Sequence, residues 1–152
     1  TPEQREKGIK LLKIAVGIQY TLPGFPCVYY GDEVGMEGYR DPFSRGCFPW
    51  GNEDEGLLDW YKTLGKIRKN CSALEGGEMV NAFSSGKQLS YIRHDNQTAL
   101  FCAFNTDEED AAIDIPPGYR NGTPLAGTEI IDGKLLIPAQ GCAFVEITHQ
   151  YV

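Results

Sequence analysis

One short stretch decides the fold of this chain: Phe25-Pro26-Cys27-Val28-Tyr29-Tyr30, followed at once by Gly31-Asp32-Glu33. The apolar run is continuous rather than alternating, and it is rich in aromatic side chains. A strand covered on both faces, as in a parallel sheet, has this pattern. The stretch therefore predicts a buried strand over residues 26–30, with polar side chains after its carboxyl end.

Helical patterns flank this expected strand. Thr1 suits an N-cap, Pro2 the first helical position and Gln4 a capping box. Apolar residues then recur at helical spacing, which predicts a helix from about residue 2 to residue 20. We expect a second helix from about residue 53 to residue 70, with acidic residues at its start and basic residues at its end. Its apolar face consists of Leu57, Trp60, Tyr61, Leu64 and Ile67.

After Gly77 the period of the apolar pattern changes from helical to two. Turn residues separate short segments, and we expect strands near residues 78–84, 87–94, 98–104, 110–115, 124–131, 134–137 and 142–148. Asp132-Gly133 between two apolar segments is a strong hairpin signal. Several short strands at this spacing predict an antiparallel sandwich. We therefore predict an α+β chain divided into residues 1–76 and 77–152.

Composition excludes several classes of protein. The chain has 152 residues, of which 41% are hydrophobic and 23% charged, as is ordinary for globular proteins. The net charge is −7 and no basic stripe occurs, so we expect no nucleic-acid partner. No run of about 18 apolar residues is present, so we expect no membrane partner. The polar residues 1–13 do not resemble a signal peptide.

The five cysteines are widely spaced and contain no C-x-x-C motif. This pattern predicts neither a zinc site nor a disulfide framework. Cys27, Cys102 and Cys142 lie in apolar runs, where a free cysteine behaves as a small hydrophobic residue. Free thiols favour a reducing compartment, so we expect a cytoplasmic protein.

The first half contains a single strand of the buried type. Such a strand needs neighbours on both edges and cover on both faces. Leaving Val28-Tyr29-Tyr30 uncovered would forgo on the order of several kcal/mol of burial. One interpretation is that more of a barrel or sheet precedes Thr1. The other is a small α+β domain whose two helices pack on the sandwich, and the spacing leaves both open.

Polar and aromatic side chains follow the expected strand. Loops after the carboxyl ends of parallel strands build active sites. Charged groups that hydrogen-bond hydroxyl pairs and aromatic faces that stack on rings are the two means of binding sugars. Asp41 and Arg45 offer the first, and Tyr39, Phe43, Phe48 and Trp50 offer the second. The structural alternative is that Asp41-Pro42 starts a helix and that Arg45 simply pairs with Asp41.

Two stretches resemble a known family. Residues Gly24 to Met36 resemble the eighth barrel strand of α-amylase-family enzymes, glycoside hydrolase family 13. Asp41-Pro42-Phe43-Ser44-Arg45, followed by Phe48-Pro49-Trp50, resembles the D-P-x-x-R loop of that family. Within it, the chain looks most like the neopullulanase, cyclomaltodextrinase and maltogenic amylase group. Residues 68–76 resemble the usual passage into the C-terminal β-sandwich.

The resemblance implies the last helix–strand–helix part of a (β/α)8 barrel, followed by an antiparallel β-sandwich C-terminal domain. The parent would be an α-glucan-cleaving enzyme that hydrolyses α-glucosidic bonds with retention. The catalytic Asp, Glu and Asp of the family follow barrel strands four, five and seven. No carboxylate of this chain matches them, so the resemblance implies no catalytic residue here and an inactive fragment.

The resemblance assigns substrate binding to Asp41 and Arg45, which match the residues that hold the sugar on the non-reducing side of the cleaved bond. The implied partners are an α-glucan or maltooligosaccharide substrate and the missing N-terminal barrel. A homo-oligomer is compatible with the family. The resemblance implies no cofactor and no metal ligand in this chain. Asp32 and Glu33 follow strand eight and do not match the catalytic pair.

A non-catalytic carbohydrate-binding or structural β-sandwich is the alternative function. A binding module would expose aromatic side chains on one face of the sandwich. Tyr91, Phe101, Phe104 and Phe144 lie in alternating runs and are expected in the core instead, whereas Tyr119 and Tyr151 are looser candidates for exposure. His94 and His149 have no nucleophile beside them and are expected to be structural or superficial.

Overall fold

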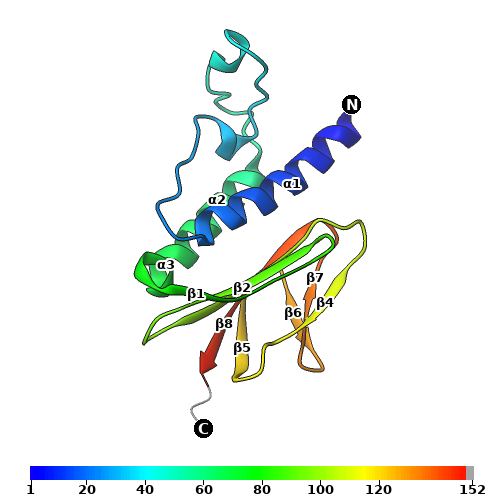
Figure 1. Ribbon diagram of the computed structural model, residues 1–152. Helices are drawn as coiled ribbons and strands as arrows, with labels where there is room; N and C mark the ends of the chain where they lie inside the picture. The colour runs from blue at the N-terminus through cyan, green and yellow to red at the C-terminus, as the bar shows by residue number, and fades with distance from the viewer. Residues whose placement is uncertain (150–152) are drawn as a thin grey trace.

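A computed structural model describes residues 1–149, with the side chains of residues 120, 121 and 149 left aside. Three α-helices and two single-turn 3-10 helices precede eight strands (Figure 1). The helical elements are α1 (Pro2–Thr21), η1 (Asp32–Val34), η2 (Phe43–Arg45), α2 (Glu55–Asn70) and α3 (Ala73–Gly76). The strands are β1 (Glu78–Ser85), β2 (Gln88–His94), β3 (Ala99–Asn105), β4 (Ala111–Asp114), β5 (Tyr119–Ala126), β6 (Glu129–Ile131), β7 (Lys134–Ile137) and β8 (Gly141–His149).

The molecule is built in three layers (Figure 1). The middle layer is a five-stranded antiparallel sheet in the order β1-β2-β3-β8-β5. Helices α1 and α2 cover one of its faces, and a three-stranded sheet in the order β4-β7-β6 covers the other. We call these three layers the helix–sandwich unit. Residues 22–54, which join α1 to α2, form the connecting segment and project away from the sandwich (Figure 1).

Strand β3 shows why the two faces of the middle sheet belong to different cores. Successive side chains of a strand point to opposite faces. Leu100, Cys102 and Phe104 point toward the helices, whereas Phe101 and Ala103 point toward the small sheet. All seven residues of β3 are buried as a result. The predicted core aromatics Tyr91, Phe101, Phe104 and Phe144 are therefore confirmed.

The predicted helices are confirmed within one or two residues. Thr1 is the N-cap of α1 and forms the expected capping box with Gln4. Asp54 is the N-cap of α2, and its carboxylate accepts a hydrogen bond from the backbone N–H of Leu57 at 3.0 Å. The apolar stripe of α2 faces the sheet, with four of the five predicted residues buried and Trp60 partly buried.

The hairpin at Asp132-Gly133 forms between β6 and β7 as predicted. Both turn residues have positive φ, +52° and +77°, which a two-residue hairpin turn of this kind requires. The single strand expected over residues 124–131 is wrong. Gly127, at φ +71°, separates β5 from β6, which belong to different sheets. A side chain at Gly127 would collide with the backbone oxygen of Cys142, so glycine permits this sharp exit from the middle sheet.

The strand predicted over residues 26–30 does not form, and this expectation is corrected. These residues form no regular element and are largely exposed: Tyr29 is 65% exposed and Tyr30 52%. A buried strand needs edge partners, and among residues 1–149 none pairs with this stretch. The α+β alternative, with both helices packed on the sandwich, describes the observed contacts of α1 and α2.

The structure also tests the expected burial of three cysteines and the expected exposure of Tyr119. Cys102 and Cys142 are buried as predicted, but Cys27 is exposed, because the apolar run around it lacks cover. Tyr119 is buried rather than exposed, and Tyr151 lies outside the described residues. Across residues 1–149, no helix is long and apolar enough to cross a membrane.

Gly77 makes the junction between helices and sandwich a tight contact. A Cβ atom at this position would lie 2.5 Å from the backbone oxygens of both Ala73 and His94. The Thr98 hydroxyl, in the loop between β2 and β3, accepts a hydrogen bond from the backbone N–H of Ala73 at 3.0 Å. The chain therefore passes from α3 into β1 close to backbone atoms of α3 and β2.

Candidate functional site

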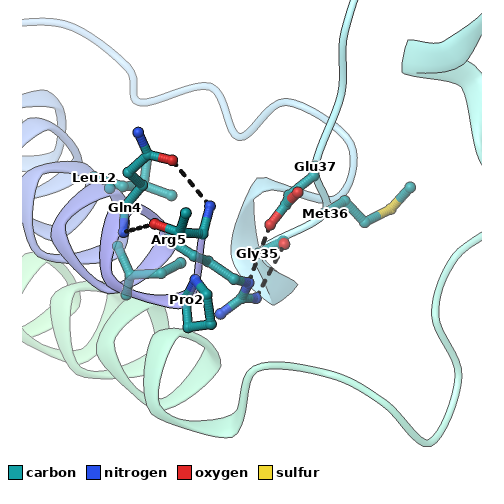
Figure 2. Close-up of a pocket in the computed structure, with 10 residues that line it drawn as sticks. Pro2, Gln4, Arg5, Leu12, Gly35, Met36 and Glu37 are labelled. Atoms are coloured by element: carbon teal, nitrogen blue, oxygen red, sulfur yellow. Dashed lines mark hydrogen bonds and ion pairs between the residues drawn. The ribbon is translucent and has the colours of Figure 1, made fainter.

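The connecting segment is fastened to the helices at its middle and at its end. The Arg5 side chain of α1 reaches Glu37 at 3.2 Å and donates to the backbone oxygen of Gly35 (Figure 2). It also reaches Asp54 at 3.3 Å. Val34 of η1 is 2% exposed, and its backbone oxygen accepts from the N–H of Asp54. These contacts hold residues 34–37 against the start of α1.

A concavity of about 710 Å³ lies at these contacts, between the first turns of α1 and residues 35–37 (Figure 2). Its lining combines the apolar side chains of Ile9, Leu12 and Met36 with polar groups of Gln4 and Arg5. Neither predicted sugar-binding residue lines it. The concavity is therefore separate from the predicted site, which lies further along the segment.

The turn over residues 41–45, which ends in η2, brings Asp41 and Arg45 side by side. The guanidinium binds the carboxylate through two hydrogen bonds, Nε to Oδ1 at 2.8 Å and Nη2 to Oδ2 at 2.7 Å. The Ser44 hydroxyl also donates to Oδ1, at 3.4 Å. This is the pairing that the structural alternative predicts, although η2 is capped by Pro42 rather than by Asp41.

The pair is open to solvent. The side chain of Asp41 is 60% exposed and that of Arg45 75% exposed. A carboxylate has about four acceptor sites, more than these three donors occupy, and a guanidinium has five N–H donors. Both groups therefore retain hydrogen-bonding capacity toward a ligand that approaches from solvent. A planar, paired arrangement of one acceptor and one donor suits neighbouring hydroxyl groups of a sugar ring.

Three aromatic rings accompany this pair on the connecting segment. The rings of Phe48 and Trp50 lie 4.5 Å apart between centroids, and Tyr30 lies 6.1 Å from Phe48. The Tyr30 hydroxyl donates to the backbone oxygen of Gly46 at 3.4 Å. The rings thus fix one another, while Trp50 stays 80% exposed. Contiguous exposed apolar groups of this kind mark an interaction surface.

Asp32 and Glu33 face the helices rather than the exposed pair. Burial, and then the neighbouring Glu33 charge, raise the pKa of Asp32. Burial and the Asp32 charge likewise raise the pKa of the Tyr61 hydroxyl on α2. One carboxylate oxygen of Glu33 is buried without a hydrogen-bond partner among the described residues. These two acids belong to the contact between η1 and α2.

The sequence missed the residues that hold the segment in place. Arg5 lies 49 positions from Asp54, and only their juxtaposition in the fold reveals the contact. Among residues 1–149, no group of three or more His, Cys, Asp or Glu side chains could hold a metal ion. The predicted sugar-binding residues Asp41 and Arg45 and the exposed ring of Trp50 all lie on the connecting segment.

Comparisons with known proteins identify the class of this chain. A cyclomaltodextrinase from Bacillus sp is 35% identical over 121 residues, a match that covers 77% of this chain and 22% of that enzyme. An amylopullulanase from Thermoanaerobacter thermohydrosulfuricus is 29% identical over 155 aligned residues, covering 94% of this chain and 10% of the enzyme. No family model matches the chain.

The fold agrees with the sequence matches. The crystal structure of a debranching enzyme from Nostoc punctiforme superimposes with a TM-score of 0.81 at 26% identity, over 90% of this chain and 31% of that one. The chain is therefore homologous to one part of the enzymes of the α-amylase family. Its relatives within that family carry the names cyclomaltodextrinase and amylopullulanase, and the chain spans about a fifth or less of their length.

Proposed function

We propose that this chain is the C-terminal part of an α-glucan-cleaving glycoside hydrolase, in which it binds sugar and the rest of the parent protein breaks the bond. Homology to cyclomaltodextrinase and amylopullulanase supports the class of reaction. The observation that carries the assignment within the chain is the exposed, doubly hydrogen-bonded pair of Asp41 and Arg45. Retaining hydrolysis through a glycosyl-enzyme intermediate is the proposed mechanism.

The chain's own contribution is positioning. The Arg45 guanidinium holds the Asp41 carboxylate in one orientation, so that its free lone pairs and the remaining N–H donors face solvent together. Sugar hydroxyls that donate hydrogen bonds to the Asp41 carboxylate and accept them from the Arg45 guanidinium would fix one glucosyl ring relative to the cleaved bond. Holding the ring in a reactive position lowers the barrier, because orientation is then supplied by binding.

We further propose that residues 1–76 are the end of a (β/α)8 barrel and that residues 77–152 form its C-terminal sandwich. Support comes from the exposed run Phe25 to Tyr30, whose continuous apolar sequence suits a parallel strand between two neighbours. In the parent protein this stretch would pair with strands outside these 152 residues. Burial of the Tyr29 and Tyr30 side chains would accompany that pairing.

The sandwich is proposed to be structural rather than a separate binding module. Among the aromatic side chains described in residues 77–149, Phe83 alone is more than half exposed, and the others lie in the cores. The free thiols, two of them exposed, support the proposal that the protein works in the cytoplasm. An α-glucan or maltooligosaccharide is the proposed substrate.

Kinetics of the intact parent enzyme test the sugar-binding role. Hydrogen bonds to charged groups contribute about 1.5–3 kcal/mol, so Asp41→Asn and Arg45→Met should each lower kcat/KM on maltooligosaccharides by about tenfold to a hundredfold. Asp59 and Lys62 form an exposed ion pair on α2 and provide the matched control. Asp59→Asn should leave kcat/KM unchanged. Wild-type kinetics in both the Asp41 and Arg45 variants would refute the role.

The isolated 152-residue chain tests the absence of catalytic groups. It should release no reducing sugar from maltooligosaccharides or pullulan, under conditions in which the parent enzyme is active. Measurable hydrolysis by the isolated chain, abolished by Asp32→Asn or Glu33→Gln, would overturn the proposal that the reacting carboxylates lie elsewhere.

A further inference from the structure

The carboxyl-terminal end of α1 is held in an unusual way. The last carbonyl groups of a helix have no partner within the helix and carry the negative end of its dipole. Basic side chains in the last turn commonly satisfy them, but α1 has none there. Two arginines from other elements do so instead. This end matters because the chain leaves it directly into the connecting segment.

Arg93 reaches the end of α1 from strand β2 of the sandwich. Its Nη1 donates to the backbone oxygen of Thr21 at 2.7 Å, and its Nη2 donates to the backbone oxygens of Ala73 at 3.0 Å and Gly77 at 2.8 Å. One side chain therefore joins the last residue of α1 to both sides of the junction at α3. Arg93 is only 1% exposed, so water does not compete for these bonds.

Arg68 completes the cap from helix α2. Its Nη1 donates to the backbone oxygen of Tyr20 at 2.7 Å, and its Nη2 donates to that of Gly24. The hydroxyl groups of Thr21 and Tyr91 add a buried hydrogen bond of 2.7 Å between α1 and β2. The bonds to Tyr20, Thr21 and Gly24 together fix where the helix ends and in which direction residues 22–24 leave it.

The burial of Arg93 has no carboxylate to explain it. The structure gives its guanidinium three carbonyl partners and no ion pair among the described residues, and its Nε is buried without a partner. Burial accordingly lowers the pKa of the guanidinium from its ordinary value. Burying a charge is unfavourable, so packing alone does not account for an arginine at this position. The planar guanidinium has several N–H donors, and these bind three backbone oxygens at once.

We propose that Arg93 and Arg68 are positioning residues for the sugar-binding site, through which the sandwich and α2 set the exit direction of the segment that carries Asp41 and Arg45. The inference rests on the proposed function of that pair. In this inference the sandwich does more than cover the helices. Arg93 lies on strand β2 of the sandwich, and its bond to Thr21 orients the start of the connecting segment. Neither arginine is proposed to touch the substrate.

Hydrogen exchange on the isolated chain tests the capping itself. In Arg93→Lys and Arg68→Met, the backbone amides of residues 19–22 should exchange about tenfold to a hundredfold faster than in wild type, since each cap is a hydrogen bond from a charged group. Amides of residues 10–14 in the same helix provide the internal control and should change far less. Equal acceleration along the whole helix would show global destabilisation and contradict the positioning role.

Kinetics of the intact parent enzyme test the consequence for the site. Arg68→Met, on a partly exposed position that should still fold, and Arg93→Lys should raise KM for maltooligosaccharides about threefold to tenfold while kcat falls less. Phe144→Leu loosens the same helix–sheet interface without touching the capped carbonyls. If Phe144→Leu lowers Tm as much as the arginine substitutions do, it should still leave KM at the wild-type value.

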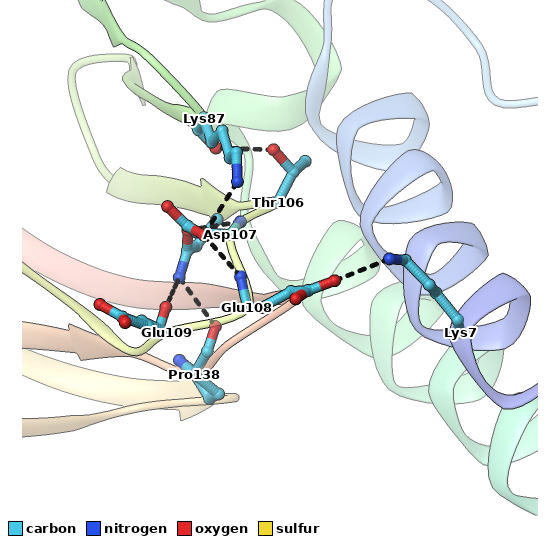
Figure 3. A network of polar contacts seen from close by, with 8 residues as sticks. Lys7, Lys87, Thr106, Asp107, Glu108, Glu109 and Pro138 are labelled. Atoms are coloured by element: carbon cyan, nitrogen blue, oxygen red, sulfur yellow. Dashed lines mark hydrogen bonds and ion pairs between the residues drawn. The ribbon is translucent and has the colours of Figure 1, made fainter. Parts of the chain in front are cut away.

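A second control uses the other end of α1. Lys7 forms an exposed ion pair with Glu108 of the sandwich at 2.8 Å (Figure 3). Lys7→Met removes this contact and should change neither KM nor the exchange of residues 19–22. If Asp41→Asn lowers kcat/KM but both arginine variants keep wild-type KM, the positioning inference fails alone. If Asp41→Asn has no effect on kcat/KM, the proposed function fails. Hydrogen exchange of residues 19–22 then still tests whether Arg68 and Arg93 cap α1.

Discussion

Phe104 and Phe25 have the same side chain but lie in two regions that differ in burial. Phe104 lies in the core between α1 and the middle sheet and is 1% exposed, whereas Phe25 lies in the connecting segment and is 99% exposed. Both regions are rich in apolar residues, yet only the helix–sandwich unit contains the partners that bury them. The comparison teaches that an apolar sequence specifies burial only where the chain also supplies the opposing surface.

The largest expected difference between the regions is the effect of truncating these two rings. Phe104→Ala should destabilise the isolated chain by about 3–5 kcal/mol, because it removes buried area and leaves a cavity. Phe25→Ala should change the free energy of unfolding by less than about 0.5 kcal/mol. Urea denaturation followed by circular dichroism measures both. Comparable losses in the two variants would mean that the connecting segment is packed after all.

A second prediction concerns the junction between α3 and β1. Gly77→Ala should destabilise the chain by about 1–3 kcal/mol, because the new methyl group meets backbone atoms that cannot rotate away. Gly76 is its neighbour, has no atom within 4 Å of an added Cβ and provides the matched control. Gly76→Ala should be neutral or slightly stabilising. Equal denaturation midpoints for the two variants would contradict a tight junction.

The third prediction concerns the ion pair of the connecting segment. Arg45→Met should change the stability of the isolated chain by no more than about 1 kcal/mol, since exposed ion pairs contribute little. The same substitution in the parent enzyme is expected to weaken turnover strongly. This separation of stability from activity, measured by denaturation and by kcat/KM, distinguishes a binding pair from a structural one.

The smallest effect is a pair of opposite pH dependences. Hydrogen bonds from Ser72 and from the backbone of Thr98 and Gln97 lower the pKa of Asp95 from 3.8 to about 2. A lowered pKa in the folded state stabilises the protein above the ordinary value, and this contribution is lost as the pH falls from about 4 to about 2. Asp95→Asn should flatten that part of the stability profile.

Asp32 should show the reverse sign. Its pKa is raised, first by burial and then by Glu33. Its contribution to stability is therefore present below the ordinary pKa and is lost as the pH rises through the raised value. Asp32→Asn should stabilise the chain at neutral pH relative to acidic pH. Thermal unfolding from pH 2 to 7 measures both variants, and slopes of the same sign would contradict the assigned causes.

The sequence predicted most elements of the helix–sandwich unit because their signals are local. The capping box at Thr1, the apolar stripe of α2 and the turn at Asp132-Gly133 each lie within a few residues. The strand over residues 26–30 was predicted from an equally clear pattern and does not form. A strand depends on hydrogen bonds from neighbours, and no stretch of sequence carries its own edge partners.

For the candidate site, too, some features follow from the local sequence and others depend on tertiary contacts. The sequence by itself determined that Asp41 and Arg45 stand one turn apart beside several aromatic residues, and homology to part of the α-amylase family agrees with the resemblance that these motifs suggested. Only the tertiary structure decided that Arg5 fastens the segment and that Arg68 and Arg93 cap α1. Those contacts join residues 48 to 72 positions apart, and only the folding of the helices onto the sheet brings such residues together.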